Sequence, residues 1–372
     1  MTTSDGAARA PPPEPSPAPE VSAPPAVADP DVKGARSFLR GFVAAALVLL
    51  GAVSTASVVV DPTGVLGLRI IPPSQQTLRD DKAQLFDALP EKPAIVVLGS
   101  SRTWAVRPAR ITELTGLPAF SFCVDNNYIY DLPAIYRFVH THSGDKLRRL
   151  LIGVDAELFQ ATKGGRLEYS RFLRPYADPG VIPPLWQMMP QLLVGATTVK
   201  SDFQTLGQMA TAKPGETRLF QNVSLPDGLV IWPRYEEEIK KGSYDLDAKL
   251  KWSIATFKPA YGSFTALYQP RIDVFRALLE QARKDGVAVD AFIPPLHPRG
   301  DKELIQLSAR TAELRRVLTD LGNEGLLRYV PDVRLSDING DPNAYYDFQH
   351  MKVENGDKIV AKVYGAGMLL KN

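Results

Sequence analysis

The feature that most constrains the fold is a short apolar run followed by small and polar residues. The run, Ala94–Leu98, has β-branched residues at its centre and no polar side chain, as expected for a strand buried on both faces of a parallel sheet. It is followed directly by Gly99, Ser100, Ser101 and Arg102. In the next segment, 104–115, the apolar residues recur at the spacing of a helix. Strand, turn and helix place a hydroxyl where open α/β sheets bind ligands, although the serines could also merely cap the helix.

The same alternation of strand and helix recurs along the chain. Further strands are predicted at 119–124, 149–154, 287–293 and 326–330, and helices at 130–142, 269–285, 302–321 and 353–364. This order predicts a parallel sheet with right-handed crossovers. The segment 163–262 interrupts it with many prolines, three tryptophans and helical pieces near 184–194, 197–211 and 245–257. We expect a functional insertion there, because long structureless loops are uncommon inside a domain.

The N-terminal part has two sections of very different composition. Residues 1 to about 35 are rich in Pro, Ala and Ser and contain no aromatic residue, so we expect 1–38 to be a disordered tail. Gly41–Val60 is then free of charge, and about twenty apolar residues suffice for a helix to cross a bilayer. We therefore predict a transmembrane anchor at 39–60 and favour it over a cleaved signal peptide, whose apolar core is usually shorter.

The charges beside this segment predict its orientation. Lys33, Arg36 and Arg40 precede it, and the first charge after it is Asp61. The positive-inside rule places the N-terminus in the cytoplasm and the remainder outside the inner membrane. We expect 61–90 to be a linker and 91–372 to be an extracytoplasmic domain. The single cysteine, Cys123, excludes an intramolecular disulfide, and a net charge of +2 argues against nucleic-acid binding.

A second motif lies near the C-terminus. Asp347 precedes His350 by three residues, a spacing that can place a carboxylate and an imidazole on the same side of a turn. Serine becomes a nucleophile when a base removes its proton, and the base is oriented by a third group. Asp347 and His350 could supply these two roles, although a surface Asp–His pair is common.

Taken together, the Gly-Ser-Ser turn after the first strand and the Asp-x-x-His motif before the last helix resemble the SGNH hydrolase superfamily. The resemblance covers about 94–155 and 265–365, and it is greatest to membrane-anchored proteins of bacterial envelopes, such as those of alginate O-acetylation and teichoic-acid D-alanylation. It implies a flavodoxin-like, three-layer parallel sheet. It also implies that Ser101 is the nucleophile, His350 the general base and Asp347 the orienting acid.

The residues expected around the oxyanion depart from the family pattern. The family uses the nucleophile's own N–H, a glycine after the second strand and an asparagine after the third. Here the second strand is followed by Asp125, Asn126 and Asn127, and the third by Asp155. A carboxylate facing an oxyanion would raise the barrier. Asp155 could turn towards Arg102 or Arg107, an asparagine could supply the donor, or catalysis could have been lost.

We expect substrate contacts from Ser100, Arg102, Asn126, Asn127, Asp155 and His297, the last of these after the 287–293 strand. His297 could equally be a loop residue positioned by its flanking prolines. The resemblance implies acyl transfer, in particular O-acetylation, to an extracytoplasmic glycan, with a polytopic membrane-bound O-acyltransferase as partner. The alternatives are an acyl esterase with the same triad, or a non-catalytic subunit that binds glycan or the acyltransferase. We expect no metal and no cofactor.

Overall fold

The computed structural model describes residues 32–68, 70–71, 77–162, 164–211, 223–331 and 333–365. The chain divides into two units, Met1–Gly51 and Ala52–Asn372. Most of the predicted tail, 1–31, lies outside the described residues, whereas 32–38 are helical. These residues begin α1 (Val32–Val60), so the helix starts earlier than the predicted anchor.

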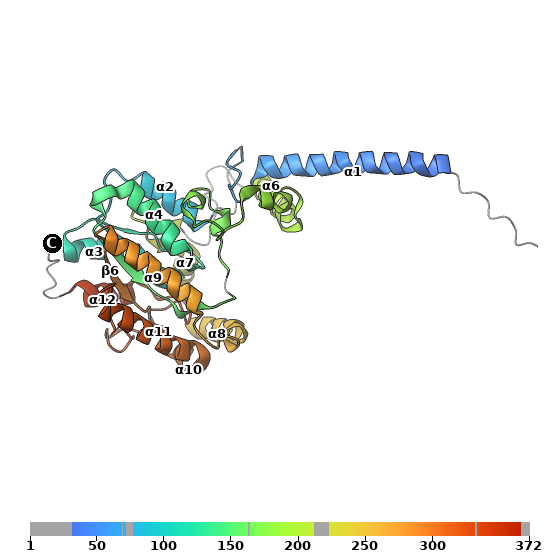
Figure 1. The fold of residues 1–372 in the computed structure, drawn as a ribbon. Helices are drawn as coiled ribbons and strands as arrows, with labels where there is room; N and C mark the ends of the chain where they lie inside the picture. Colours follow the sequence, from blue (N-terminus) through green and yellow to red (C-terminus); the bar gives the residue numbers. More distant parts are fainter. Residues whose placement is uncertain are drawn as a thin grey trace, which may run out of the picture. The chain divides into compact units, whose positions relative to one another are not determined.

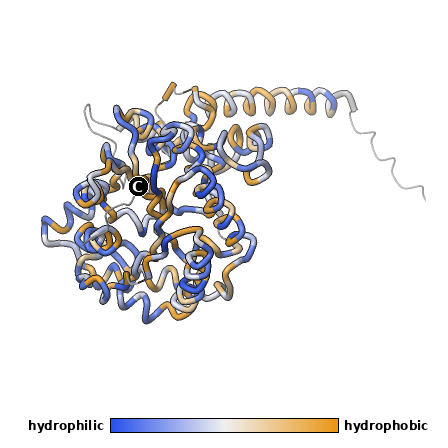
Figure 2. The backbone as a smooth tube through the Cα atoms, turned by 60° about the vertical axis from the view of Figure 1, so that its left-hand side comes forward, coloured by the Kyte–Doolittle hydropathy of each residue, from blue (hydrophilic) through white to orange (hydrophobic). Residues whose placement is uncertain are grey.

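Helix α1 is long and apolar enough to cross a membrane. Its stretch Gly34–Val60 has 27 residues, or about 40 Å at 1.5 Å per residue, which exceeds the hydrocarbon thickness of about 30 Å. Figure 2 shows hydrophobic colouring along most of this helix, with hydrophilic residues near its start. Length and composition support a membrane span; the orientation stays a prediction.

The second unit is built on a parallel sheet of five strands in the order β2-β1-β3-β6-β7. The strands are β1 (Ile95–Leu98), β2 (Ala119–Ser121), β3 (Arg149–Gly153), β6 (Ala288–Phe292) and β7 (Arg328–Tyr329). Val96 pairs with Phe120 on one side and with Leu150 on the other. The predicted α/β class and parallel sheet are confirmed. The order reverses beside β1, and ligands of such sheets bind outside the carboxyl ends of the strands at this point.

Helices cover both faces of the sheet (Figure 1). Ile95 and Val97 contribute to the core beneath α3 (Pro108–Thr115) and α12 (Val353–Tyr364). Val96 and Leu98 contribute to the opposite core, which is completed by α4 (Asp131–Ser143), α9 (Gln269–Lys284) and α11 (Ile305–Asn323). Since successive strand residues point to opposite faces and each fully buried aliphatic side chain contributes about 1.5–3 kcal/mol, β1 stabilises both layers.

Two helix boundaries differ from the prediction. The helix expected at 104–115 begins at Pro108, because proline disfavours helical backbone at the preceding residue and Arg107 is extended (φ −78°, ψ 122°). The helix expected at 302–321 is preceded by the separate α10 (Pro298–Glu303). Short 3₁₀ turns lie at Ser101–Thr103, Gly144–Lys146, Ala156–Phe159, Leu167–Tyr169 and Arg174–Tyr176.

Part of the predicted linker belongs to the core. Within 61–90, α2 (Leu78–Asp87) buries Phe86 completely. Lys82 of the same helix is also fully buried, and its Nζ donates to the backbone oxygens of Ser121 and Gly228. Burial lowers the pKa of this amine to about 8. The linker interpretation missed this helix because its sequence mixes charged and apolar residues.

The insertion is mostly helical, as predicted. Its helices are α5 (Leu185–Val194), α6 (Ala196–Thr211), α7 (Pro233–Lys240) and α8 (Leu246–Gly262). It also contains an antiparallel hairpin of β4 (Val223–Ser224) and β5 (Val230–Ile231), which the sequence analysis missed. Gly228, in the turn of this hairpin, is one of the two residues that Lys82 contacts. The hairpin is therefore attached to the sheet domain.

Candidate active site

The turn after β1 holds its two serines in different environments. Gly99 has φ 156°, and a Cβ at this position would lie 2.4 Å from Oγ1 of Thr103, so a side chain cannot be accommodated without movement. Ser100 caps the following 3₁₀ turn by accepting from the N–H of Arg102 at 3.1 Å. Ser101 begins that turn. The local sequence thus fixes Ser100 in the turn and places Ser101 at its start.

Ser101, His350 and Asp347 form a continuous hydrogen-bonded chain. Nε2 of His350 lies 2.8 Å from Oγ of Ser101, and Nδ1 lies 2.7 Å from Oδ2 of Asp347. The structure therefore brings these three side chains together, although Ser101 and His350 are 249 positions apart in the sequence. This is the arrangement expected of a nucleophile, a base and an orienting group.

The loop that carries His350 is fixed at both ends. The N–H of Tyr346 donates to the backbone oxygen of His350 at 2.7 Å, which closes the loop. Helix α12 begins three residues after His350. A Cβ on Gly356 of α12 would lie 1.9 Å from the backbone oxygen of Ala105. The close approach at this glycine brings the start of α12, and with it the His350 loop, against the Ser101 turn.

Asp347 is held in its ionised form. Burial favours its neutral form, but the His350 ring and the N–H groups of Gln349 and His350 lower the pKa of this carboxyl below its usual value. The two N–H groups donate to Oδ1 at 2.7 and 2.9 Å. Oδ2 is left to accept from the imidazole. An ionised carboxylate there fixes the ring orientation and stabilises a protonated imidazole.

Two aromatic rings, 5.6 Å apart between their centroids, pack beside His350. Trp104 stacks at 6.3 Å between ring centroids, and Trp232 lies at 5.0 Å. Trp104 follows the Ser101 turn, whereas Trp232 comes from the insertion, between β5 and α7. Tyr346 stacks on Trp232 in turn, at 5.8 Å. The insertion therefore contributes directly to the surroundings of the base.

A cleft of about 420 Å³, here called the aromatic cleft, opens on one side of Ser101. It is lined by Ser101, His350, Trp104, Trp232, Tyr346, Leu229, Ile231, Ile239, Arg107, Glu236, Lys352, Glu354 and their neighbours. Apolar and aromatic side chains form most of this lining, and charged groups lie among them. Such a surface can bind a sugar ring through its apolar face while charged groups bind hydroxyls.

A smaller cleft of about 210 Å³, here called the ionic cleft, also includes Ser101. It is lined by Ser100, Ser101, Arg102, Asn126, Asp155, Glu157, Gln160, Phe257, Ala260, Tyr261 and Gln349. The guanidinium of Arg102 lies 3.2 Å from Asp155 and 3.1 Å from Glu157, and it donates to the backbone oxygen of Pro294 at 2.6 Å. Buried charges paired in this way stabilise one another.

The position of Asp155 answers one question raised by the sequence. Its carboxylate pairs with Arg102 and accepts from the hydroxyl of Ser100. Of the two arginines that Asp155 could turn towards, Arg102 is thus its partner, whereas Arg107 pairs with Asp357. Although burial opposes the charge of Arg102, Asp155 and Glu157 raise the pKa of its guanidinium. The positive charge therefore offsets the carboxylate beside the serine turn.

The remaining predicted residues have different positions. Asn126 lines the ionic cleft together with Ser101. Asn127 is completely buried, and neither atom of its amide has a hydrogen-bond partner within the part of the chain that the structure describes. His297 lines neither cleft: it caps α10 by accepting from the N–H of Arg299 at 3.1 Å. Its substrate role is unsupported, and the alternative of a loop residue with a structural role accounts for its contacts.

Several site residues were missed in the sequence. Tyr261 donates to Glu157 at 3.0 Å and accepts from Gln349, which links the ionic cleft to the residue beside His350. Glu157 follows Asp155 by two residues at the end of β3, so the position of that strand end could have indicated it. Tyr261 lies near the end of α8 and Trp232 lies between β5 and α7, and the sequence of the insertion does not indicate which of its residues face the site.

Among the described residues, no three His, Cys, Asp or Glu side chains are grouped so as to hold a metal ion. Cys123 is buried, and burial raises the pKa of its thiol to about 12. A thiol with so high a pKa stays protonated at neutral pH and is a poor nucleophile. No family model matches this chain, and no curated protein matches it with significant similarity.

Proposed function

We propose that this protein is a serine acyltransferase of the SGNH type that acylates an extracytoplasmic envelope glycan. The observation that carries the proposal is the chain of hydrogen bonds from Asp347 through His350 to Ser101, at 2.7 and 2.8 Å, at the wall of an aromatic cleft. The strand order β2-β1-β3-β6-β7 with helices on both faces is consistent with the flavodoxin-like, three-layer sheet of that superfamily.

The proposed reaction has two acyl transfers. Oγ of Ser101 attacks the carbonyl carbon of the acyl donor while Nε2 of His350 accepts the hydroxyl proton. The bond between the carbonyl and the donor's leaving group then breaks, and His350 gives the proton to that group. The resulting ester on Ser101 is attacked by an acceptor hydroxyl, whose proton passes to His350 and finally returns to Ser101. Asp347 stabilises the protonated imidazole in both halves.

The oxyanion requires donors in place of the family's glycine and asparagine. Asn126 is the best placed side-chain candidate, since it lines the same cleft as Ser101. The backbone N–H of Ser101 is the second. The carboxylate of Asp155 does not prevent these two groups from donating to the oxyanion, because it is bound by Arg102 and Ser100. A preorganised donor aimed at the oxyanion contributes about 2.7–4 kcal/mol to such catalysis.

The aromatic cleft favours a sugar hydroxyl over water as the acceptor. Trp104, Trp232 and Tyr346 line it beside the catalytic imidazole, and flat aromatic surfaces bind the apolar faces of pyranose rings. An esterase would use the same triad with water as acceptor. A non-catalytic glycan-binding subunit is the second candidate function, and the carboxylate of Asp155 at the expected donor position favours it.

The proposal includes a place in the cell. We propose that α1 anchors the protein in the inner membrane with a cytoplasmic N-terminus and a periplasmic domain, and that a polytopic O-acyltransferase supplies acyl groups across the membrane. A reporter fused after residue 372 should then be active only outside the cytoplasm. Reporter activity in the cytoplasm would exclude action on an envelope glycan.

Trapping the acyl-enzyme tests the reaction directly. The detergent-solubilised full chain is mixed with p-nitrophenyl acetate, quenched in acid and analysed by intact mass. We expect an acetyl adduct that is absent from Ser101→Ala and retained by Ser100→Ala. An adduct lost from Ser100→Ala but present in Ser101→Ala would reassign the nucleophile. A wild type that binds glycan without forming an adduct would support the non-catalytic subunit.

A further inference from the structure

Helix α6 of the insertion has an unusual distribution of polar and apolar side chains. On α6, the polar residues Ser201, Asp202 and Thr205 are buried, with Thr205 fully inaccessible. The apolar residues face outwards: Phe203 is 72% exposed, and Leu206 and Met209 are exposed as well. This is the reverse of a surface helix of a water-soluble domain, whose apolar stripe faces the core.

Apolar residues of α6 form a stripe along one face, in which Phe203, Leu206 and Ala210 are exposed and Val199 is partly buried. Val199, Phe203, Leu206 and Ala210 recur at intervals of four, three and four residues, which places them on one face of a helix. On α5, Trp186 is 71% exposed and Val194 is exposed too. An exposed apolar patch that is contiguous on neighbouring elements indicates an interaction surface.

The same segment is almost without charge. Between residues 181 and 211 the charged residues are Lys200 and Asp202, whereas charged residues make up 23% of the whole chain. Asp202 is buried and does not contribute to the outer surface. A protein partner would ordinarily be met by a surface with a polar and charged rim, so the low charge favours hydrocarbon as the partner.

The segment is attached to the end of the apolar helix. Oγ of Ser57, in the last turn of α1, donates to Oδ2 of Asp202 on α6 at 2.6 Å. Figure 1 shows α6 beside this end of α1. Leu68 and Ile70, shortly after α1 ends, are also exposed. These exposed apolar residues therefore gather where α1 would leave the bilayer.

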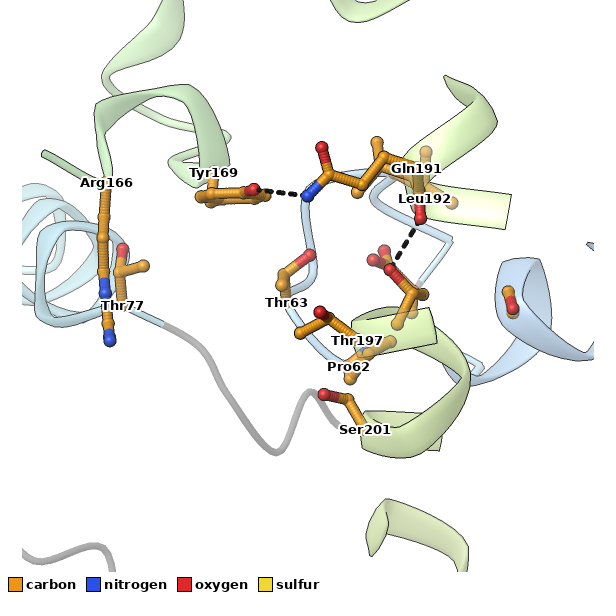
Figure 3. A pocket seen from close by; sticks show the side chains of 13 residues that line it. Pro62, Thr63, Thr77, Arg166, Tyr169, Gln191, Leu192, Thr197 and Ser201 are labelled. Carbon is orange, nitrogen blue, oxygen red and sulfur yellow. Dashed lines mark hydrogen bonds between the residues drawn. The ribbon is translucent and has the colours of Figure 1, made fainter. Parts of the chain in front are cut away.

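The polar side of α6, together with Gln191 and Leu192 of α5, faces a pocket of about 230 Å³ (Figure 3). Its lining is rich in hydroxyl groups and includes Thr63, Thr77, Thr197 and Ser201. Nε2 of Gln191 lies 3.3 Å from the hydroxyl of Tyr169 across it. Helix α6 thus presents polar groups inwards and apolar groups outwards, as a protein segment in contact with lipid does, while α5 buries Met188 and Leu192 and exposes Trp186 and Val194.

We propose that α5 and α6 lie in the outer interface of the membrane that α1 crosses, with Phe203 and Leu206 among the acyl chains and Trp186 at the level of the headgroups. Tryptophan is enriched at that level, and helices with an apolar outer face bind in the interfacial plane. The partner of this surface is a glycerophospholipid bilayer. The proposal rests on α1 crossing the membrane and is independent of the acyl-transfer chemistry.

Spin labelling in a bilayer tests this placement. The full chain is reconstituted in nanodiscs of phosphatidylethanolamine and phosphatidylglycerol, with one nitroxide label on Phe203→Cys or Leu206→Cys. Because Cys123 is buried, the wild type should take up no label. Collision rates with oxygen and with a water-soluble nickel chelate are then measured. We expect oxygen collisions to exceed those with nickel at both positions, because oxygen concentrates in hydrocarbon.

Two control positions make the result decisive. Ile305→Cys replaces an apolar residue that is 73% exposed at the start of α11, and we expect its label to favour the nickel chelate. Leu49→Cys lies in α1 and should favour oxygen. If Leu49 favours oxygen while Phe203 and Leu206 behave like Ile305, the helices lie in water and the proposal is wrong. If Phe203 and Leu206 are shielded from both reagents, a second copy of the chain covers them, which also overturns it. If Leu49 favours nickel, the membrane span fails and the proposal fails with it.

Discussion

The two clefts that meet at Ser101 are lined by different kinds of side chain from different segments of the chain. The ionic cleft is formed largely by strand ends, with Arg102 after β1 and Asp155 after β3, and its groups are tied to one another by ion pairs. The aromatic cleft takes Trp232 and Ile239 from the insertion and Tyr346 from the loop before α12. One side of Ser101 is thus formed mainly by segments that follow strands, with Tyr261 of α8 added, and the other mainly by the insertion and the loop before α12.

We infer from this difference that the ionic cleft positions the serine turn and that the aromatic cleft recognises the acceptor. Strand ends are held in register by backbone hydrogen bonds, so they position charged groups accurately, as the serine turn requires. Inserted segments can change without altering the sheet, so they suit recognition of a particular acceptor. We therefore expect changes in the ionic cleft to affect folding and the reaction itself, and changes in the aromatic cleft to affect the choice of acceptor.

The largest expected effect comes from replacing Ser101 or His350, the proposed nucleophile and general base. Ser101→Ala and His350→Ala should each reduce acyl transfer by about 10⁴-fold or more, and the double variant should be no worse, because triad members act as a unit. Asp347→Asn should cost as much or less, since it orients the base. Steady-state transfer rates to a glycan acceptor measure this. Additive losses would show that the two side chains act separately.

The next effect distinguishes a buried ion pair from an exposed one. Arg102→Met leaves Asp155 and Glu157 without their common partner and should lower the free energy of unfolding by about 3–5 kcal/mol. Arg107→Met removes a partly exposed pair with Asp357 and should cost about 0–1 kcal/mol. Denaturant unfolding of the detergent-solubilised chain compares them. Equal losses of stability in the two variants would contradict the expectation that the buried ion pairs of the ionic cleft stabilise the fold more than the exposed pair does.

A smaller effect is expected in the aromatic cleft. Trp232→Ala should lower kcat/KM for the glycan acceptor by about tenfold, equivalent to about 1.4 kcal/mol of lost ring contact, and leave the rate of acetyl adduct formation within a factor of about two. Trp252→Ala provides the matched control, because Trp252 is 65% exposed and lines neither cleft. Should both variants behave alike, the acceptor does not contact Trp232.

The smallest effect concerns pH. Because the folded-state pKa of Asp347 lies below its ordinary value, which is about 3.9 in unfolded chains, its ionised form stabilises the fold above that value. This contribution is lost as the pH falls through the folded-state pKa. The stability difference between wild type and Asp347→Asn should therefore shrink between about pH 6 and about pH 3. Asp145→Asn, at an exposed position, should change stability by less than about 0.5 kcal/mol throughout.

The parts of the fold with regular periodicity could be predicted from sequence. The strand at 94–98 and the helix at 353–364 were found because burial on both faces and a 3.6-residue apolar spacing leave clear patterns. Helix α2 was missed because it buries Arg79 and Lys82, charged residues whose burial depends on partners from other segments. The Arg79 guanidinium contacts Asp131 at 2.6 Å, and no local pattern contains that pairing.

The candidate site was predictable to the same extent. Ser101, Asp347 and His350 were identified from two motifs, and their hydrogen bonds agree with the roles assigned to them. For His297 the sequence left two alternatives open, and its contact in the structure is that of a loop residue, since its ring accepts from the N–H of Arg299 at the start of α10. Trp232 and Tyr261 could not be assigned, since their positions depend on how an irregular insertion folds back on the sheet.

The attachment of the β4–β5 hairpin has a consequence for how the lining of the aromatic cleft can change while the sheet stays the same. Lys82 binds the backbone oxygen of Gly228 and not a side chain, and an amine that loses its proton near pH 8 still has two N–H groups for the two oxygens it contacts. The contact with Lys82 therefore depends on the hairpin backbone; only Gly228 must be retained, because its φ is 81° and a Cβ there would lie 2.2 Å from the backbone oxygen of Ser121. Segments that carry other residues in place of Trp232 can be exchanged during evolution, or grafted in the laboratory, while the same lysine docks them beside an unaltered triad.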